Sequence, residues 1–165
     1  MYNIGVIGLG YIGLPLAIEL GKIYDVIGYD KNIRRIKDLK KGIDYSGELN
    51  FKKINQAKKI IFSYDSSKLK KCNIYIIAVP TPVYKNKKPD LRLIKNAIKS
   101  FAKFIKKNDI IIFESTFYPG ATEEFCVPLI EKYSNLAFNK DFFVGYCPER
   151  INPGDKKNNI KNINK

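Results

Sequence analysis

A glycine motif near the N-terminus constrains the fold more than any other feature of the sequence. An apolar run, residues 4–7, is typical of a buried strand. It continues directly into Gly8-x-Gly10-x-x-Gly13 and then into helical apolar spacing from Leu14. Gly8 permits a tight turn, Gly10 leaves room for a pyrophosphate to approach the backbone, and Gly13 allows a helix to pack closely on a strand. This order predicts the first unit of a dinucleotide-binding fold.

A carboxylate at the end of the next expected strand strengthens that prediction. Residues 26–29 are apolar and lead into Asp30, which lies 22 residues after Gly8. At this position a carboxylate can accept the ribose hydroxyls of an adenosine. The alternative is that Asp30 only caps the helix that follows. Asp30 favours NAD over NADP, because a carboxylate about 4 Å from a 2′-phosphate is penalised by roughly 1–4 kcal/mol. Arg34 or Arg35 could instead receive such a phosphate.

Strands and helices alternate along the rest of the chain. The further strands are expected at residues 60–62, 73–79, 110–113 and 142–146. The helices are expected at residues 31–40, 51–57 and 90–107, and in a segment after Pro119-Gly120 that Pro128 shortens or kinks. This pattern predicts an α/β fold, a Rossmann-type doubly wound parallel sheet of five or six strands in a single domain. The domain is expected to span residues 1–155, with a basic polar tail at 156–165.

The unusual polar and glycine clusters all fall where an expected strand ends. They are Gly8–Gly13, Asp30, Thr81, Ser115–Thr116 and Cys147–Glu149. The carboxyl ends of parallel strands meet at one edge of the sheet, and ligands of open α/β folds bind there. The separate clusters therefore predict a single cleft.

Residue types that are absent or scarce exclude several kinds of site. The sequence has no histidine, which removes a histidine general base and a Ser-His-Asp triad. Its three cysteines, Cys72, Cys126 and Cys147, include no CxxC pair, so we expect no structural zinc knuckle, no metal site and a reducing compartment. We expect Cys126 in the core and Cys72 at a strand edge. Because no apolar run is long enough to span a bilayer and no signal peptide is recognisable, we expect a cytoplasmic protein without a membrane partner.

The formal charge of +14 raises the alternative of nucleic-acid binding. The surplus is almost entirely lysine, spread over every expected helix and loop, and there are only four arginines to supply bidentate contacts. This distribution favours solvated faces, and we expect no nucleic-acid partner. A salt titration with duplex DNA distinguishes the two interpretations, because specific binding would be tight and steeply salt-dependent.

Four segments resemble a known family. They are residues 8–17 (Gly-Leu-Gly-Tyr-Ile-Gly-Leu-Pro-Leu-Ala), 79–82 (Val-Pro-Thr-Pro), 114–124 (Glu-Ser-Thr-Phe-Tyr-Pro-Gly-Ala-Thr-Glu-Glu) and 146–155 (Tyr-Cys-Pro-Glu-Arg-Ile-Asn-Pro-Gly-Asp). In this order they are similar to the N-terminal NAD-binding domain of the UDP-glucose/GDP-mannose dehydrogenase family, from Tyr2 to about Asp155. The last segment is closer to the branch that acts on UDP-N-acetylhexosamines than to the UDP-glucose branch.

The resemblance implies a reaction and a set of site residues. The family oxidises the C6 hydroxymethyl of a nucleotide sugar to a carboxylate with two NAD⁺, as in polysaccharide biosynthesis. By resemblance, the cofactor is held at the pyrophosphate by Gly8, Leu9, Gly10, Tyr11, Ile12 and Gly13, at the adenosine end by Asp30 and Arg35, and toward the nicotinamide by Val79, Thr81, Pro82, Ser115 and Thr116. Thr116 also matches a residue that positions water, and Glu149 matches one that assists hydrolysis of a thioester, as a carboxylate within hydrogen-bond reach can. The alternatives are that Ser115 and Thr116 cap a turn and that Glu149 pairs with a neighbouring cation.

The resemblance also implies parts that this sequence does not contain. Family members continue into a linking helix and a C-terminal domain, which supply the nucleophilic cysteine and most of the nucleotide-sugar site. Nothing carries the nucleophile role onto Cys147, because relatives usually have serine or asparagine there. We therefore expect the chain to be incomplete on its own, or to be completed by a C-terminal domain or a partner chain. The alternatives are a non-catalytic NAD-binding module and a 3-hydroxyacid-type dehydrogenase domain.

Overall fold

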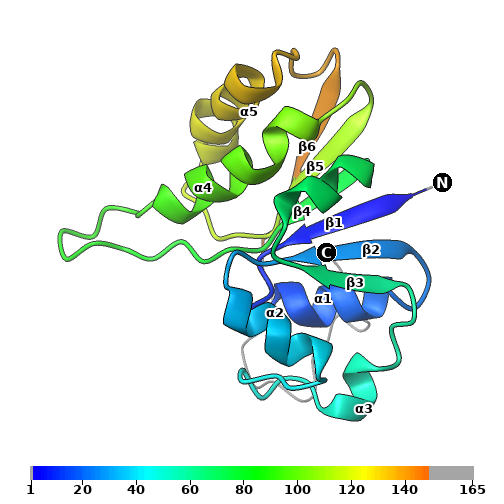
Figure 1. Ribbon diagram of the computed structural model, residues 1–165. Helices are drawn as coiled ribbons and strands as arrows, with labels where there is room; N and C mark the ends of the chain where they lie inside the picture. Colours follow the sequence, from blue (N-terminus) through cyan, green and yellow to red (C-terminus); the bar gives the residue numbers. More distant parts are fainter. Residues whose placement is uncertain (1, 149–165) are drawn as a thin grey trace.

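One parallel sheet organises the computed structural model, which describes residues 2–148. Its six strands are β1 (Asn3–Ile7), β2 (Asp25–Tyr29), β3 (Ile60–Ser63), β4 (Ile74–Ile77), β5 (Asp109–Phe113) and β6 (Phe142–Tyr146). They are arranged in the order β3-β2-β1-β4-β5-β6, and every neighbouring pair is parallel (Figure 1). The predicted doubly wound α/β sheet is confirmed, with six strands. The expected boundary after residue 155 lies outside the described residues.

Helices cover the two faces of the sheet in two groups. The α-helices are α1 (Gly13–Leu20), α2 (Ile33–Lys40), α3 (Phe51–Ile54), α4 (Arg92–Phe101) and α5 (Val127–Ser134). In Figure 1, α1, α2 and α3 lie together on one side and α4 and α5 on the other. The alternation of β1 explains the division, because Ile4 and Val6 join the cluster beneath α1 to α3, whereas Ile7 joins the cluster beneath α4 and α5.

Several element ends differ from the sequence-based expectation. Helix α4 ends at Phe101 and continues as a 3₁₀ turn, η2 (Ala102–Phe104), instead of reaching residue 107. Between β3 and β4 the chain forms a longer 3₁₀ segment, η1 (Ser66–Lys71). Before Pro128 the chain forms a π-helical turn, η3 (Thr122–Cys126), and Pro128 lies in the first turn of α5. A proline there has no intrahelical acceptor to lose, so the helix restarts rather than kinks.

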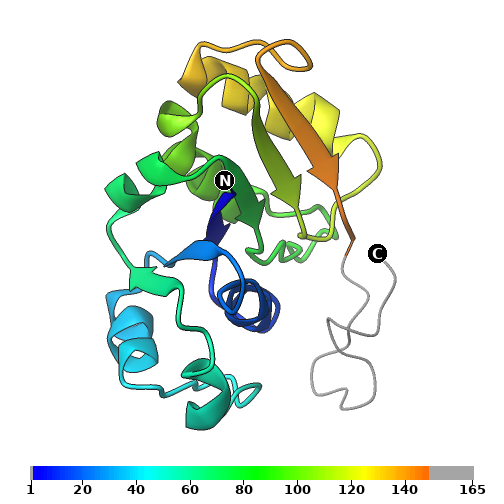
Figure 2. The same cartoon turned by 90° about the vertical axis from the view of Figure 1, so that its right-hand side faces the viewer.

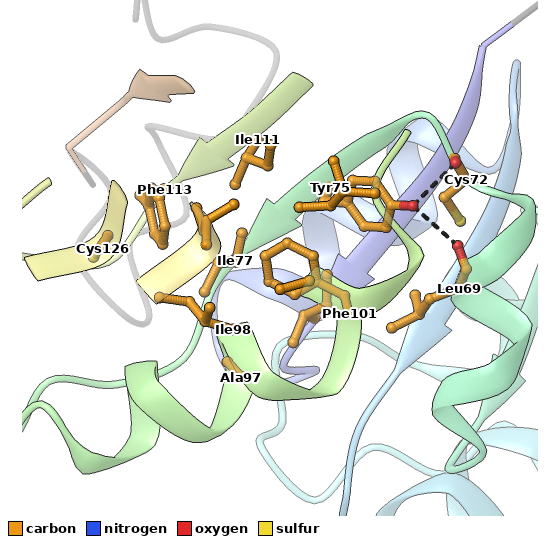
Figure 3. Packing of buried hydrophobic residues seen from close by; sticks show 14 of the residues in the cluster. Leu69, Cys72, Tyr75, Ile77, Ala97, Ile98, Phe101, Ile111, Phe113 and Cys126 are labelled. Carbon is orange, nitrogen blue, oxygen red and sulfur yellow. Dashed lines mark hydrogen bonds between the residues drawn. The ribbon is translucent and has the colours of Figure 1, made fainter. Parts of the chain in front are cut away.

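The core beneath α4 contains a polar group that is satisfied internally. The Tyr75 and Phe101 rings stack with centroids 5.0 Å apart, and the Tyr75 hydroxyl donates to the carbonyl of Cys72 at 3.1 Å (Figure 3). Burial raises the pKa of Tyr75, so the phenol stays protonated at neutral pH. The prediction that Cys126 is a core residue is confirmed, and Cys72, which was expected at a strand edge, is also fully buried just before β4. Burial raises the pKa of each of these thiols to about 12, so both are inert.

Candidate functional site

The carboxyl ends of the strands bring the predicted site segments to one edge of the sheet. Strand β1 lies between β2 and β4, so the glycine loop that follows β1 is central. Asp30 follows β2 on one side, and Val79 to Pro82 follow β4 on the other. Ser115 and Thr116 follow β5, and Cys147 follows β6, which lies beside β5 in Figure 2. The convergence predicted from the sequence is therefore present in the described residues.

The glycine loop is shaped by steric limits at two of its three glycines. Gly8 has a φ of +92°, and a Cβ there would lie 2.8 Å from the carbonyl oxygen of Ala78. A Cβ on Gly13 would lie 1.8 Å from the carbonyl oxygen of Gly8, so the start of α1 is in direct contact with the end of β1. Around Gly10, by contrast, no atom lies within 4 Å of where a Cβ would stand. The backbone is thus open at the position where a pyrophosphate would approach, and the loop fits a dinucleotide.

Asp30 connects the glycine loop to the start of α2. One of its carboxylate oxygens accepts the N–H of Leu9 at 3.0 Å, and the other accepts the N–H of Asn32 at 2.9 Å. The N-cap of α2 is Asn32, whose side-chain oxygen accepts the N–H of Arg35. Asp30 is therefore not merely a helix cap. Each of its oxygens retains a second lone pair for a ribose hydroxyl.

Arg35 is held mainly by the protein itself. Its Nε donates to the carbonyl oxygen of Leu9 at 2.9 Å, and its Nη1 lies 2.7 Å from Oδ1 of Asp44. The remaining nitrogen, Nη2, is buried and has no hydrogen-bond partner among the described residues. Arg35 thus stands beside the predicted adenosine end, but one of its three nitrogens already bonds to the glycine loop and a second pairs with Asp44.

The segment between α2 and α3 was missed by sequence reasoning. No site was expected in residues 43–50, yet the Asp44 side chain is fully buried, and the neighbouring Tyr45 and Ser46 border a cleft. The cleft has a volume of about 320 Å³ and is lined by Gly10, Asn32, Arg34, Arg35, Tyr45 and Ser46. The available clue was Asp44-x-Ser46, since an Asp two residues before a Ser can accept a hydrogen bond from its backbone and order a turn.

On the other side of the glycine loop, hydroxyl groups tie two strand ends together. Thr81 donates from its hydroxyl to the carbonyl oxygen of Thr116 at 2.6 Å, and Ser115 donates to the carbonyl oxygen of Val79 at 2.6 Å. Ser115 is buried, whereas Thr116 and Pro82 are exposed. The Ser115 hydroxyl therefore links β5 to β4 instead of capping the following turn, and the Thr116 side chain is left facing solvent at the sheet edge.

The last strand brings the chain to the same edge. The N–H of Cys147 donates to the carbonyl oxygen of Phe113 at 2.9 Å, and the thiol-bearing residue is half-buried. The Tyr146 ring stacks on Phe117 with centroids 5.8 Å apart, which joins β6 to the loop after β5. Glu149 lies outside the described residues, so its expected role in hydrolysis stays a prediction.

Two kinds of feature are absent from the described part of the chain. Among residues 2–148, no group of three or more His, Cys, Asp or Glu side chains is placed to hold a metal ion. Within the same residues, no helix has the length and apolar character needed to cross a membrane.

Comparisons with known proteins agree with this geometry. The sequence model of the UDP-glucose/GDP-mannose dehydrogenase family, NAD binding domain, matches residues 2–165. The UDP-N-acetyl-D-glucosamine 6-dehydrogenase of Pseudomonas aeruginosa is 51% identical over 163 residues, which cover 99% of this chain and 39% of that protein. Protein CapL of Staphylococcus aureus is 50% identical over 99% of this chain and 38% of its own length.

A solved structure also has this fold. The UDP-D-ManNAc dehydrogenase from Pyrococcus horikoshii superposes with a TM-score of 0.84 at 36% identity, over 92% of this chain and 37% of that one. The chain thus spans about two fifths of the length of the relatives it matches. The prediction made from the four motifs is confirmed: this chain belongs to the UDP-glucose/GDP-mannose dehydrogenase family, as its NAD binding domain.

Proposed function

We propose that this chain is the NAD-binding portion of a nucleotide-sugar 6-dehydrogenase that acts on a UDP-N-acetylhexosamine. The observation that carries the proposal is the glycine loop, which is closed by contact at Gly8 and Gly13 and open at Gly10. The relatives that are about half identical include a UDP-N-acetyl-D-glucosamine 6-dehydrogenase, which supports the substrate class. In the proposed reaction the C6 hydroxyl carbon loses two hydrides to two NAD⁺ and gains the oxygen of one water, and protons are released to solvent.

The proposed cofactor site follows the edge of the sheet. The backbone from Gly8 to Gly13, together with the N-terminus of α1, faces the pyrophosphate, because the first N–H groups of a helix have no intrahelical acceptor and carry partial positive charge. Asp30 accepts the adenosine ribose hydroxyls, with Arg35 beside it. Val79, Thr81, Pro82 and Ser115 form the side toward the nicotinamide. When bound there, NAD⁺ supplies the hydride acceptor for each oxidation.

One of the two proposed catalytic groups, Thr116, lies at the end of β5, and the other, Glu149, follows β6 in the sequence. Thr116 is exposed at the carboxyl end of β5, and Thr81 holds its backbone carbonyl by a 2.6 Å hydrogen bond. Its hydroxyl is thereby available to orient a water molecule. Glu149, two residues after Cys147 in the sequence, is proposed to take a proton from that water.

The site favours NAD over NADP on electrostatic grounds. The Asp30 carboxylate would stand against a 2′-phosphate. Of the two arginines that could compensate, Arg35 already pairs with Asp44 at 2.7 Å, and the Arg34 guanidinium carbon lies 5.6 Å from the centre of the Tyr45 ring. Calorimetric titration of the wild type with NAD and NADP tests the assignment. NAD is expected to bind at least about tenfold more tightly, and equal affinity for the two would contradict it.

Catalysis is proposed to need residues beyond this chain. Because the relatives are more than twice as long, a C-terminal domain or a partner chain is proposed to supply the nucleophile and the nucleotide-sugar site. The second candidate function, a non-catalytic NAD-binding module, is favoured by the same difference in length. An assay of NADH production with UDP-N-acetylglucosamine separates the two. The isolated chain is expected to bind NAD without turnover, and turnover by it alone would overturn the need for a further part.

A further inference from the structure

The segment 43–50 is built around one buried carboxylate. The side chain of Asp44 has no exposed surface. Its Oδ1 accepts the backbone N–H of Ser46 at 3.0 Å and the Ser46 hydroxyl at 2.6 Å, and its Oδ2 accepts the N–H of Leu49 at 3.0 Å. Burial by itself raises the pKa of Asp44, but the hydrogen bonds from Ser46, Arg35 and Leu49 outweigh it and lower the pKa below its usual value. Asp44 is therefore an ionised anchor for the whole segment.

Arg35 connects Asp44 to the glycine loop. The guanidinium that pairs with Asp44 also donates from Nε to the carbonyl oxygen of Leu9, and the N–H of Leu9 in turn donates to Asp30. A planar guanidinium fixes the relative position of the two groups it bonds. The pair is shielded from solvent, since the Arg35 side chain is only 11% exposed. Segment 43–50, the glycine loop and the end of β2 are thus one connected polar unit.

The unit presents an aromatic surface to the cleft. Tyr45 is 60% exposed, and the guanidinium carbon of Arg34 lies 5.6 Å from the centre of its ring. Both side chains line the same cleft as Gly10 and Asn32. Tyrosine rings and arginine guanidinium planes are surfaces on which a nucleobase stacks. Tyr2, which is equally exposed, instead packs edge-to-face against Tyr24 at the opposite edge of the sheet.

Building on the proposed function, we propose that Arg34 and Tyr45 receive the adenine ring of the dinucleotide. Asp44 is the positioning residue that, through Arg35, holds this surface beside the glycine loop. The location agrees with the ribose assigned to Asp30, because the cleft adjoins Asn32, whose N–H that carboxylate accepts. Neither Asp44 nor Tyr45 is expected to take part in hydride transfer, so their effect falls on affinity for the adenosine half.

Calorimetry with AMP and with NAD tests the stacking surface. Tyr45→Ala is expected to raise the dissociation constants of both ligands about tenfold, since stacking of one base on an aromatic ring accounts for such a change. Tyr45→Phe retains the ring and is expected to bind both within about twofold of the wild type. Tyr2→Ala is the matched control, because Tyr2 has the same 60% exposure and lies away from the cleft. Unchanged AMP affinity in Tyr45→Ala would overturn the proposal.

A double-mutant cycle tests whether Asp44 acts through this surface. Asp44→Asn is expected to weaken AMP binding about tenfold, like Tyr45→Ala, and the double variant is expected to be no weaker than Tyr45→Ala alone. Losses that multiply would show that Asp44 does not act through Tyr45. Should Asp44→Asn fail to fold, Arg35→Lys replaces it in the cycle, since it keeps a cation for Asp44 and loses the fork to Leu9. A wild type that binds neither NAD nor AMP would overturn the proposed function itself.

Discussion

The two sides of the glycine loop are held by different kinds of interaction. On the β2 side, the charged groups of Asp44 and Arg35 pair, and the backbone of Leu9 connects Arg35 to the Asp30 carboxylate. On the β4 and β5 side, the strand ends are joined by neutral hydroxyl-to-carbonyl hydrogen bonds from Thr81 and Ser115, and Thr116 is exposed. On the first side the polar groups bond to one another within the protein, whereas the second side exposes Thr116 to solvent.

This difference suggests that the two sides of the glycine loop differ in rigidity. A shielded ion pair with further hydrogen bonds fixes geometry, and breaking it leaves a buried charge without a partner. Neutral bonds each contribute less. The side proposed to bind adenosine therefore has a fixed shape before any ligand arrives. The side proposed to face the nicotinamide is held more weakly.

The largest loss of stability is expected at the contact of Gly13 with the carbonyl oxygen of Gly8, which lies between the two sides. Gly13→Ala would place a methyl 1.8 Å from a backbone oxygen that cannot move independently of β1. We expect a loss of about 4 kcal/mol or more in the free energy of unfolding, with NAD binding abolished. Gly10→Ala is the matched control, with a change in stability of about 0.5 kcal/mol or less and weakened NAD binding. Denaturant titration measures both, and a Gly13→Ala protein as stable as the wild type would refute the contact.

The ionic side is expected to be the next most sensitive. Asp44→Ala leaves the Arg35 guanidinium buried without its carboxylate, so we expect the free energy of unfolding to fall by about 3 kcal/mol. The measurement is urea unfolding of the two proteins followed by circular dichroism. A loss below that of Ser115→Ala would reverse the proposed order of the two sides.

The contribution of Asp44 to stability is also expected to depend on pH. The pKa of Asp44 is lowered in the folded protein from its ordinary value of 3.8. Its contribution is therefore fully present above that ordinary value and is lost as the pH falls through the lower folded-state pKa. The gap in stability between the wild type and Asp44→Asn is expected to narrow as urea unfolding is repeated at decreasing pH below about 4. A gap that stays constant or widens on acidification would contradict an ionised Asp44.

Substitution of Asp30, the proposed ribose acceptor, is expected to have an intermediate effect, on NAD affinity. Asp30→Ala removes the proposed acceptor for the ribose hydroxyls and the observed acceptor for the N–H of Leu9. We expect NAD affinity to fall about 10- to 100-fold, equivalent to roughly 1.4–2.8 kcal/mol, with NADP affected less. Calorimetric titration with each dinucleotide provides the comparison. If the variant and the wild type bind NAD equally, Asp30 lies outside the site.

The smallest effect is expected on the neutral side. Ser115→Ala removes one hydroxyl-to-carbonyl bond, and we expect a loss of about 1 kcal/mol in the free energy of unfolding. Thr116→Val is the matched control, because Thr81 bonds the backbone carbonyl of Thr116, which the substitution keeps. Thermal unfolding of both variants measures the two changes in stability. A Thr116→Val protein less stable than Ser115→Ala would show that its side chain has a structural partner.

Most of the fold could be predicted from the sequence, and so could the meeting of the strand ends at one edge of the sheet. The glycine spacing and the apolar runs depend on local periodicity, so the strands, their edge and the role of Asp30 as more than a cap could be anticipated. The pairing of Arg35 with Asp44 could not, because it joins residues across a turn whose path no periodic pattern determines. Helix α4 was extended too far for a related reason: its apolar spacing continues beyond Phe101, where the backbone tightens into η2.

The stacked pair in the core also provides the protein with an internal optical probe. The sequence has no tryptophan, so its near-ultraviolet absorption comes mainly from tyrosine. Burial raises the pKa of Tyr75 above its ordinary value of 10.0, and its hydroxyl donates to the carbonyls of Leu69 and Cys72, so this phenol keeps its proton far into alkali. A late step in phenolate absorbance therefore reports when solvent first enters the space between the sheet and α4, without any added dye or label.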